Sequence, residues 1–213
     1  MIKRVLLIIS SMFLIFLYES HASDDGEIAS LREEATIAAD HYHFMRQAYG
    51  LAINSGKHGN HTFGALLVYK NKAILTSENT VYTDRNVHSH AELNLMTKAK
   101  IEIPPEVLRE CTMYTSTAPC MLCCASIWYR NIKRVVYGVS YETFAKLTGY
   151  EDKSIPCDKL YQETGKPLEW IGPVLEEEGL RVFYYWPQDS FRGSLLEKLH
   201  ELGVETPQNM RTE

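Results

Sequence analysis

Hydrophobic and polar positions follow a helical period in the first part of the chain and a strand-like pattern after it. Apolar residues recur at three- and four-residue intervals over about Glu27–Ile53, which predicts a long amphipathic helix that Gly56 and Gly59 end. The run Phe63–Tyr69 is rich in strand formers, and a short polar turn separates it from Ala73–Glu78. These two segments are therefore expected to form a β-hairpin.

Helices and strands then alternate through the middle of the chain. Proline marks two boundaries, because Pro104 stops a helix and Pro119 opens one. The pattern predicts, in order, a helix, a strand, a helix and a strand over His90–Lys100, Cys111–Ser116, Cys120–Arg130 and Val135–Val139. Strands joined through helices favour a mixed or parallel sheet with both faces covered, so the predicted fold class is α/β.

The signals weaken after Ser140. We expect a short helix over Tyr141–Leu147, a strand over Leu180–Trp186 and a terminal helix over Ser190–Leu202. Residues 207–213 are predicted to form a frayed tail.

The first 22 residues have the layout of a secretory signal peptide. Lys3 and Arg4 give a short positive region, and Val5–Tyr18 is a nearly unbroken apolar run of 14 residues. Two small residues, Ser20 and Ala22, occupy positions −3 and −1 of a predicted cleavage after Ala22. We therefore expect removal of residues 1–22 and export to the periplasm or the medium, with no stable membrane insertion afterwards. The alternative is an uncleaved N-terminal membrane anchor.

The length of the chain predicts its domain organisation, and its net charge argues against one class of partner. The chain of 213 residues has room for one domain, residues 23–213, with a substantial core. Its formal net charge is −5, and cleavage after Ala22 makes it more negative because two basic side chains and one acidic side chain are lost. Nucleic-acid surfaces need clustered Lys and Arg, and residues 23–213 carry no basic stripe. No nucleic-acid polymer is therefore expected as a partner.

The sequence does not determine which of the cysteines form disulfides. There are five in all, and an odd number in an exported protein does not form a complete disulfide framework. If two of them bind a metal, at least one of Cys111, Cys124 and Cys157 is free or pairs between chains.

Two short motifs carry the chemistry of the chain. They are His90-Ala91-Glu92 and Pro119-Cys120-Met121-Leu122-Cys123, and each starts a predicted helix. Catalytic zinc takes three protein ligands and leaves the fourth position to water, and His90, Cys120 and Cys123 supply three. The two cysteines are three residues apart and so share one helix face. A closed zinc site with Cys124 or Cys111 as the fourth ligand is the alternative.

Glu92 adds a carboxyl group next to this predicted site. It lies two residues after His90, so it projects near the metal without binding it. A carboxyl in that place can take a proton from water and return it to a leaving group. The motifs together therefore predict metal-assisted hydrolysis with Glu92 as the catalytic residue.

The order His-x-Glu followed by Pro-Cys-x-x-Cys resembles that of the cytidine and deoxycytidylate deaminase superfamily. The resemblance runs from about Tyr42 to Trp186 and includes Phe63–Val68, Tyr114–Cys120 and Arg134–Gly138, which are similar to strands of that family. Within the superfamily the chain looks most like the purine-base branch, which includes bacterial guanine deaminases. The resemblance implies a three-layer α/β/α fold with a central five-stranded mixed sheet, often as a homodimer.

The resemblance also implies an activity and further site residues. It implies a Zn²⁺-dependent hydrolytic deaminase of a free purine base or nucleoside, guanine first, with Asn79 and the backbone amide of Ala91 binding the base. Asp152 corresponds to an acidic step that grips guanine, although a solvated loop is an equal alternative. Residues 140–213 are expected to form a C-terminal extension that packs on the site. Cys124, where the family usually has Ala or Leu, is expected to pack as a small hydrophobic residue.

Other activities remain open from the sequence. A cytosine, cytidine or adenosine deaminase fits the same motifs, and a non-catalytic zinc module that binds a partner is the alternative from a different class. Aromatic residues of the extension could stack on a base, although each also fits a core position. They are Trp170, Tyr184, Tyr185 and Trp186.

Overall fold

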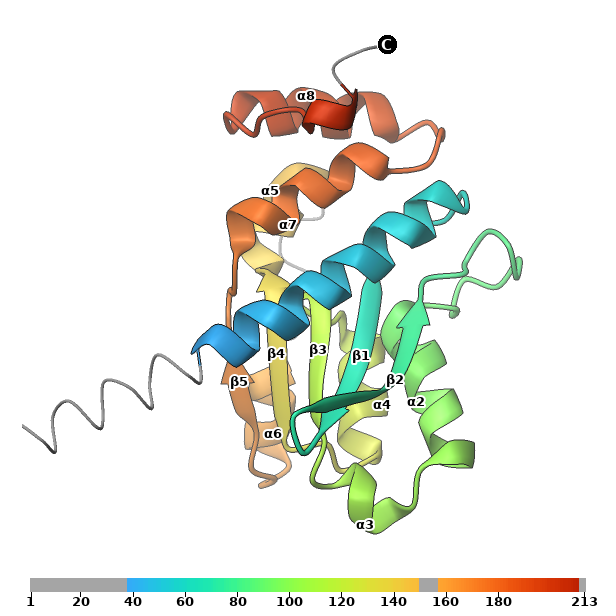
Figure 1. Ribbon diagram of the computed structural model, residues 1–213, viewed down its shortest axis with the longest axis vertical. Coiled ribbons are helices and arrows are strands. Elements are labelled where there is room, and N and C mark those ends of the chain that lie inside the picture. The colour runs from blue at the N-terminus through green and yellow to red at the C-terminus, as the bar shows by residue number, and fades with distance from the viewer. Residues whose placement is uncertain (1–37, 150–156, 211–213) are drawn as a thin grey trace, which may run out of the picture. The chain divides into compact units, whose positions relative to one another are not determined.

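A computed structural model describes residues 38–149 and 157–210, and in this part of the chain five strands form one mixed sheet (Figure 1). The sheet and the helices that follow it belong to residues 41–213, the second of two units into which the chain divides. The strands are β1 (Gly64–Tyr69), β2 (Lys72–Glu78), β3 (Thr112–Thr117), β4 (Arg134–Val139) and β5 (Glu169–Ile171).

The strand order is β2-β1-β3-β4-β5. β1 runs antiparallel to both of its neighbours, β2 and β3, whereas β3, β4 and β5 are parallel to one another. In the register, Tyr114 of β3 lies opposite Leu66 of β1 and Val136 of β4. A hairpin therefore supplies one edge of the sheet, and helical crossovers supply the rest.

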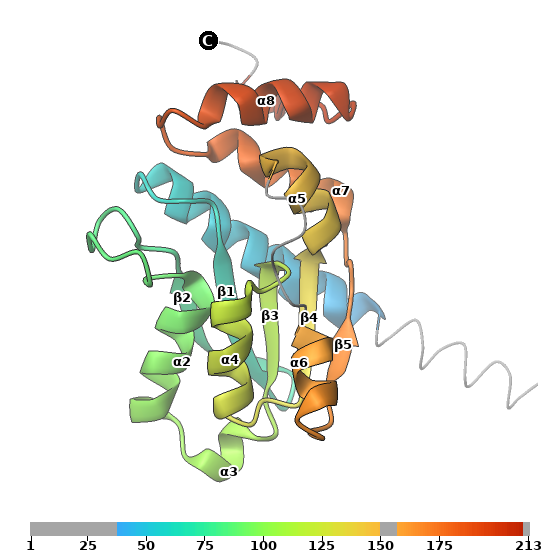
Figure 2. The same ribbon diagram turned by 180° about the vertical axis from the view of Figure 1, so that it is seen from behind.

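Helices cover both faces of this sheet (Figures 1 and 2). The first helix, residues 38–57, lies on one face with α7, and α2, α4 and α6 lie on the other. α5 and α8 pack on each other beyond one end of the sheet. The bounds are α2 (Ala91–Glu102), α3 (Pro105–Leu108), α4 (Met121–Tyr129), α5 (Tyr141–Thr148), α6 (Cys157–Glu163), α7 (Glu176–Val182) and α8 (Arg192–Glu201).

The two faces of the central strands enter two separate cores. Ala65 and Leu67 of β1 pack with residues of α2 and α4, whereas Leu66 and Val68 pack with the first helix. Successive side chains of a strand point to opposite faces, so a strand with both faces covered needs an unbroken apolar run. The sequence of β1 meets that need, which is why the three-layer arrangement predicted from the sequence is correct.

A third cluster of apolar side chains lies in the C-terminal part. It joins the end of β4 to α5, α8 and the turn of 3₁₀-helix Phe183–Tyr185. Its buried members are Val139, Leu147, Phe183, Tyr184, Trp186, Leu195 and Leu199.

The strand expected over Leu180–Trp186 is wrong. Residues 176–182 form α7 and the next three form the 3₁₀ turn, while the fifth strand is Glu169–Ile171. Three consecutive glutamates open α7, where the positive end of the helix dipole favours acidic side chains. The aromatic run after them is buried in tertiary contacts, so its strand propensity does not decide its conformation.

The remaining differences between the predicted and the observed elements are at the ends of helices. The first helix continues through Gly56 to residue 57, and Pro105 opens the short helix α3 instead of only ending α2. The expected signal peptide and Asp152 lie outside the described residues, as does the end of the tail. Within the described part of the chain, no helix is both long enough and apolar enough to cross a membrane.

Candidate active site

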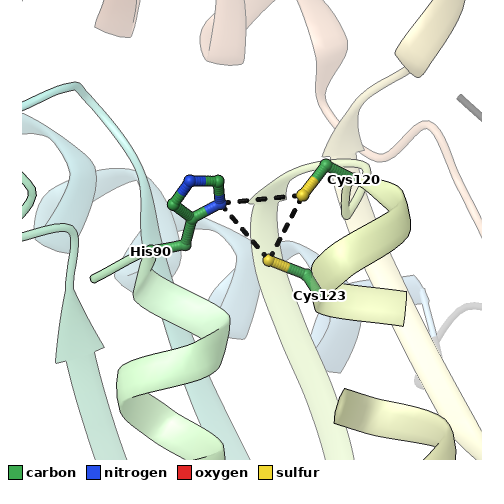
Figure 3. A group of neighbouring side chains, drawn as sticks. All are labelled: His90, Cys120 and Cys123. Atoms are coloured by element: carbon green, nitrogen blue, oxygen red, sulfur yellow. Dashed lines mark hydrogen bonds between the residues drawn. The ribbon is translucent and has the colours of Figure 1, made fainter. Parts of the chain in front are cut away.

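His90, Cys120 and Cys123 meet where α2 and α4 begin (Figure 3). The Nδ1 atom of His90 lies 3.6 Å from the Sγ atom of Cys120 and 3.5 Å from that of Cys123, and the two sulfurs are 3.6 Å apart. His90 and Cys120 are the N-cap residues of their helices, both with extended backbone, and neither side chain caps its helix. The two side chains turn instead toward Cys123, in the first turn of α4.

These separations fit a tetrahedral zinc ion. Zn–S bonds of about 2.3 Å and a Zn–N bond of about 2.1 Å place two sulfurs about 3.8 Å apart, and a sulfur about 3.6 Å from a nitrogen. The sulfur–sulfur distance of 3.6 Å and the sulfur–nitrogen distances of 3.6 and 3.5 Å agree closely with these values. A set of three protein ligands leaves one position for water or substrate, as in catalytic zinc sites.

The other cysteines are placed elsewhere. Cys124 forms a disulfide with Cys157, and the thiol of Cys111 donates to the carbonyl oxygen of Val107 at 3.3 Å. Among the described residues, only the group His90, Cys120 and Cys123 has the composition and spacing to hold a metal ion. A fourth protein sulfur is therefore not part of this group. Cys124 is buried, as expected of a small hydrophobic residue, and its sulfur is in addition bonded to that of Cys157, a pairing that the sequence left open.

The two ligand sulfurs influence each other's protonation. The hydrogen bond with the Cys123 thiol, together with the contact to His90, lowers the pKa of Cys120 to about 4. The same contact with Cys120, and burial, raise the pKa of Cys123 above its ordinary value. The contact with Cys120 also raises the pKa of His90, so metal binding to this group releases the protons that the three side chains share.

Glu92 lies beside the ligand group without joining it. Its Oε1 atom accepts a hydrogen bond from the Thr115 hydroxyl at 3.0 Å, and its Oε2 atom lies 3.5 Å from the sulfur of Cys123. The residue is only 6% exposed, and burial raises the pKa of its carboxyl group. A raised pKa brings a carboxyl group closer to the range where it exchanges protons near neutral pH.

A cavity of about 580 Å³ opens onto these groups, a volume typical of small-molecule sites. His90, Glu92, Cys120 and Cys123 all contribute to its lining. Six of the thirteen other lining residues are Phe, Tyr or Trp. These aromatic side chains are Phe63, Tyr82, Tyr141, Phe144, Trp186 and Phe191.

Asn79 reaches the cavity from the residue after β2. It is 1% exposed, and its side-chain oxygen accepts a hydrogen bond from the Val81 amide at 3.1 Å. That bond orients the side chain so that its amino group is the donor available to a ligand in the cavity. Ala91 is the first residue of α2 and is fully buried. Asp152 lies outside the described residues.

One wall of the cavity combines Trp186, a stacking candidate from the sequence, with three residues that the sequence did not indicate: His61, Tyr82 and Asp189. The rings of His61 and Trp186 stack with centroids 4.5 Å apart, and the His61 ring lies 5.0 Å from that of Tyr82. Asp189 accepts hydrogen bonds from the Tyr82 hydroxyl and the Trp186 indole, both at 3.1 Å. Burial lowers the pKa of His61. No local motif marks these residues, because His61 and Tyr82 lie more than 100 positions before Trp186 and Asp189.

The aromatic residues of the extension have different places. Of the four, only Trp186 lines the cavity. Trp170 packs on Tyr137 with ring centroids 4.7 Å apart, and Tyr184 is buried in the C-terminal cluster. Core packing is thus the role of these two, as the alternative interpretation of the sequence held.

Comparison with known proteins places this geometry in a family. Residues 38–139 match the family described as cytidine and deoxycytidylate deaminase zinc-binding region. The chain is 32% identical over 147 residues to a probable cytosine deaminase of Schizosaccharomyces pombe, covering 64% of this chain and 86% of that protein. It is also 32% identical over 133 residues to the guanine deaminase of Bacillus subtilis, covering 61% of this chain and 80% of the relative.

The fold has solved counterparts as well. One comes from a study of A-to-I editing by tRNA:A34 deaminases, with a TM-score of 0.56 and 23% sequence identity. The match covers 66% of this chain and 98% of the other. At that identity the likeness concerns the fold alone, whereas the sequence relatives and the ligand group concern the chemistry. The chain therefore belongs to the cytidine and deoxycytidylate deaminase family of zinc-dependent hydrolases, which act on C–N bonds of nucleobases or nucleosides.

Proposed function

We propose that this protein catalyses the hydrolytic deamination of a small free purine base or nucleoside, with guanine as the first candidate. The proposal rests on one observation: the three metal-ligand side chains and the buried carboxyl group of Glu92 line the same cavity. In this reaction water replaces an amino group on a ring carbon. The C–N bond breaks, a carbonyl group forms and ammonia leaves.

In this proposal His90, Cys120 and Cys123 hold the zinc ion. A zinc ion bound there supplies Lewis acidity and lowers the pKa of water enough for hydrolysis near neutral pH. The two thiolates balance the charge of the metal, and the aromatic walls keep bulk water away from the reacting atoms.

Glu92 moves the protons. Its carboxylate accepts a proton from the attacking water and delivers it to the ring nitrogen; it then takes the proton of the hydroxyl group added to the ring carbon and delivers that one to the departing amine. The Thr115 hydroxyl holds the Oε1 atom, so the Oε2 atom stays on the side of Cys123 and the metal position. One carboxyl group can thus serve as base first and as acid afterwards.

Asn79 and the backbone amide of Ala91 bind the base. The amino group of Asn79 donates to a carbonyl oxygen or ring nitrogen, which orients the ring over the metal position. We expect Asn79→Ala to raise KM and weaken the preference between bases, with zinc content unchanged. Steady-state kinetics on at least two bases, with zinc measured on the same samples, tests this role. An unchanged KM for every base would contradict it.

The aromatic side chains in the walls of the cavity favour a small planar substrate. Aromatic side chains from the hairpin region, α5 and the C-terminal segment surround the ligand group, and flat rings stack well on such walls. The net charge of −5 gives little attraction for a polymer of phosphates. A free base or nucleoside therefore suits the site better than RNA.

Guanine and cytosine are the two candidates for the preferred substrate. Guanine comes first because the cavity of about 580 Å³ has room for a two-ring base, and the chain is also similar to the Bacillus subtilis guanine deaminase. Cytosine is the second candidate, since the similarity to the Schizosaccharomyces pombe protein covers 86% of that chain.

Ammonia release from a panel of substrates tests the proposed function. The panel contains guanine, adenine, cytosine, their nucleosides and an anticodon stem-loop RNA that carries adenosine. We expect the fastest release from guanine. Faster release from cytosine or from the RNA would replace the substrate assignment, and zinc-loaded protein without turnover on any member would support the non-catalytic alternative.

Zinc content tests the ligand assignment separately. Elemental analysis should find about one zinc per chain in the wild type, because three ligands stand at catalytic spacing. Cys120→Ser and Cys123→Ser should lose most of it, whereas Cys111→Ser should keep it because that thiol faces Val107. Full zinc content in either ligand variant would contradict the assignment.

A further inference from the structure

A disulfide lies next to the metal-ligand group and belongs to none of the roles above. Cys124 directly follows Cys123 in α4, and its sulfur is bonded to that of Cys157, the first residue of α6. Both side chains are fully buried, at 0% exposure. The bond therefore joins two helices of the same layer inside the protein (Figure 2).

The first turn of α4 has few other attachments. Met121 is 51% exposed and Leu122 is 43% exposed, so neither fastens the turn to the core. The N-cap residue makes no side-chain capping bond. Cys123 is buried in the core beside residues of α2, and its sulfur faces the metal position. Cys124 adds a covalent attachment of the same turn to α6.

The far end of α4 is held in a different way. The indole of Trp128 donates to the Thr164 hydroxyl at 2.7 Å, and the Tyr161 hydroxyl of α6 donates to the Ile132 carbonyl oxygen at 2.7 Å. Because the disulfide joins the starts of the helices and these bonds join their ends, α4 and α6 run in the same direction. The two kinds of attachment can be removed independently.

We propose that the Cys124–Cys157 disulfide is a positioning element of the metal centre, which holds the first turn of α4 so that Cys120 and Cys123 stay at ligand spacing before metal arrives. The inference rests on the metal-binding role of those two cysteines in the proposed function. The disulfide also removes the Cys124 thiol from its place beside the ligands, where a free thiol would compete for the metal or pair with Cys120. Groups that orient metal ligands commonly change metal affinity by about 10–100-fold.

Zinc release from Cys124→Ala/Cys157→Ala tests the proposal without any substrate. Zinc-loaded protein is mixed with excess chromophoric chelator under native conditions, and the release rate is compared with that of the wild type. We expect release at least about tenfold faster from the double variant. Cys124→Ala/Cys157→Val, which refills part of the lost volume, serves if the first pair does not fold.

A matched control separates positioning from general stability. Tyr161→Phe/Thr164→Val removes two of the hydrogen bonds at the far ends, leaving those of Lys166 to Trp128 and Asn131, and keeps the disulfide in place. We expect this control to unfold at a lower temperature but to release zinc at the wild-type rate. Wild-type release from the cysteine pair, or equally fast release from the control, would overturn the proposal. Failure of the substrate panel would leave this result unaffected, because release is measured without turnover.

Discussion

At the scale of single residues, Glu92 combines two properties that rarely occur together. It is an acidic side chain with almost no solvent contact, and its partners are a hydroxyl group and a sulfur instead of a cation. Buried carboxyl groups without a cationic partner are costly, because the charged form loses its hydration. A function that needs the carboxyl group explains why it is kept at this place.

Glu92→Gln tests that explanation. The amide is nearly isosteric with the carboxyl group, so the variant should fold and retain zinc. It cannot accept a proton from water, so turnover should fall by at least about 10²–10⁴-fold. Steady-state kinetics and zinc analysis on the same samples measure both effects. Near-wild-type turnover would show that another group moves the protons.

Asp189, which also lines the cavity, is the second residue with a distinct role at this scale. Its Oδ1 atom accepts from the amides of Phe191 and Arg192, both at 3.0 Å, while Oδ2 accepts from Tyr82 and Trp186. All four bonds go to the protein, so we assign Asp189 to holding the wall and not to contacting the base.

Asp189→Ala should therefore loosen the wall without disturbing the metal. We expect KM to rise by about tenfold, since losing bonds to a charged acceptor costs about 1.5–3 kcal/mol each and part of that loss reaches the binding site. Asp189→Asn keeps one carbonyl oxygen and should lie between the variant and the wild type. Kinetics on the best substrate decides, and an unchanged KM in Asp189→Ala would contradict this role.

At the scale of elements, the first helix packs on the sheet at unusually close range. A Cβ atom on Gly138 of β4 would collide with the hydroxyl of Tyr49 and lie 2.6 Å from the carbonyl oxygen of Ser116. The Tyr49 hydroxyl in turn donates to the carbonyl oxygen of Val174 at 2.8 Å. Glycine at this position thus allows one tyrosine to join the helix, the sheet and the segment before α7.

Gly138→Ala should destabilise the protein by about 1–3 kcal/mol, because the added methyl group has no space. Gly50→Ala, in the first helix with nothing within 4 Å of the new Cβ atom, is the matched control. It should be neutral or stabilising by up to about 1 kcal/mol, since alanine favours helix more than glycine does. Urea denaturation measures both free energies of unfolding. Equal stability of Gly138→Ala and the wild type would refute the close packing.

At the scale of the whole molecule, the cysteines and the N-terminal sequence point to the same compartment. Disulfides persist in oxidising surroundings, and the Cys124–Cys157 bond is of that kind. The basic residues and apolar run ahead of Ala22 have the order of a signal peptide. We propose on these grounds that the protein is exported and oxidised outside the cytoplasm.

N-terminal sequencing and thiol counting test this together. Protein recovered from outside the cytoplasm should begin near Ser23, and after denaturation with zinc removed it should expose three thiols per chain, because Cys124 and Cys157 are paired. An intact Met1 on soluble cytosolic protein would contradict export. Five reactive thiols in the exported protein would contradict the pairing.

The sequence by itself determined those features that depend on neighbours along the chain. Three-residue spacing places Cys120 and Cys123 on one turn, and the unbroken apolar run of β1 requires helices on both faces of the sheet. Apart from the short helix α3, the helices and strands from residues 63 to 148 were predicted to within a few residues for the same reason. The two motifs also predicted that His90, Cys120, Cys123 and Glu92 lie close together, as they do in the structure.

Only the tertiary structure decided the features that depend on distant residues. His61 and Asp189 are close in the cavity wall although 128 positions separate them, and Cys124 pairs with Cys157 across the layer of helices. The segment 180–185 became helical because its aromatic side chains fill a core built by α5 and α8. Such contacts gain their free energy from burial among side chains far away in sequence, so no local pattern encodes them.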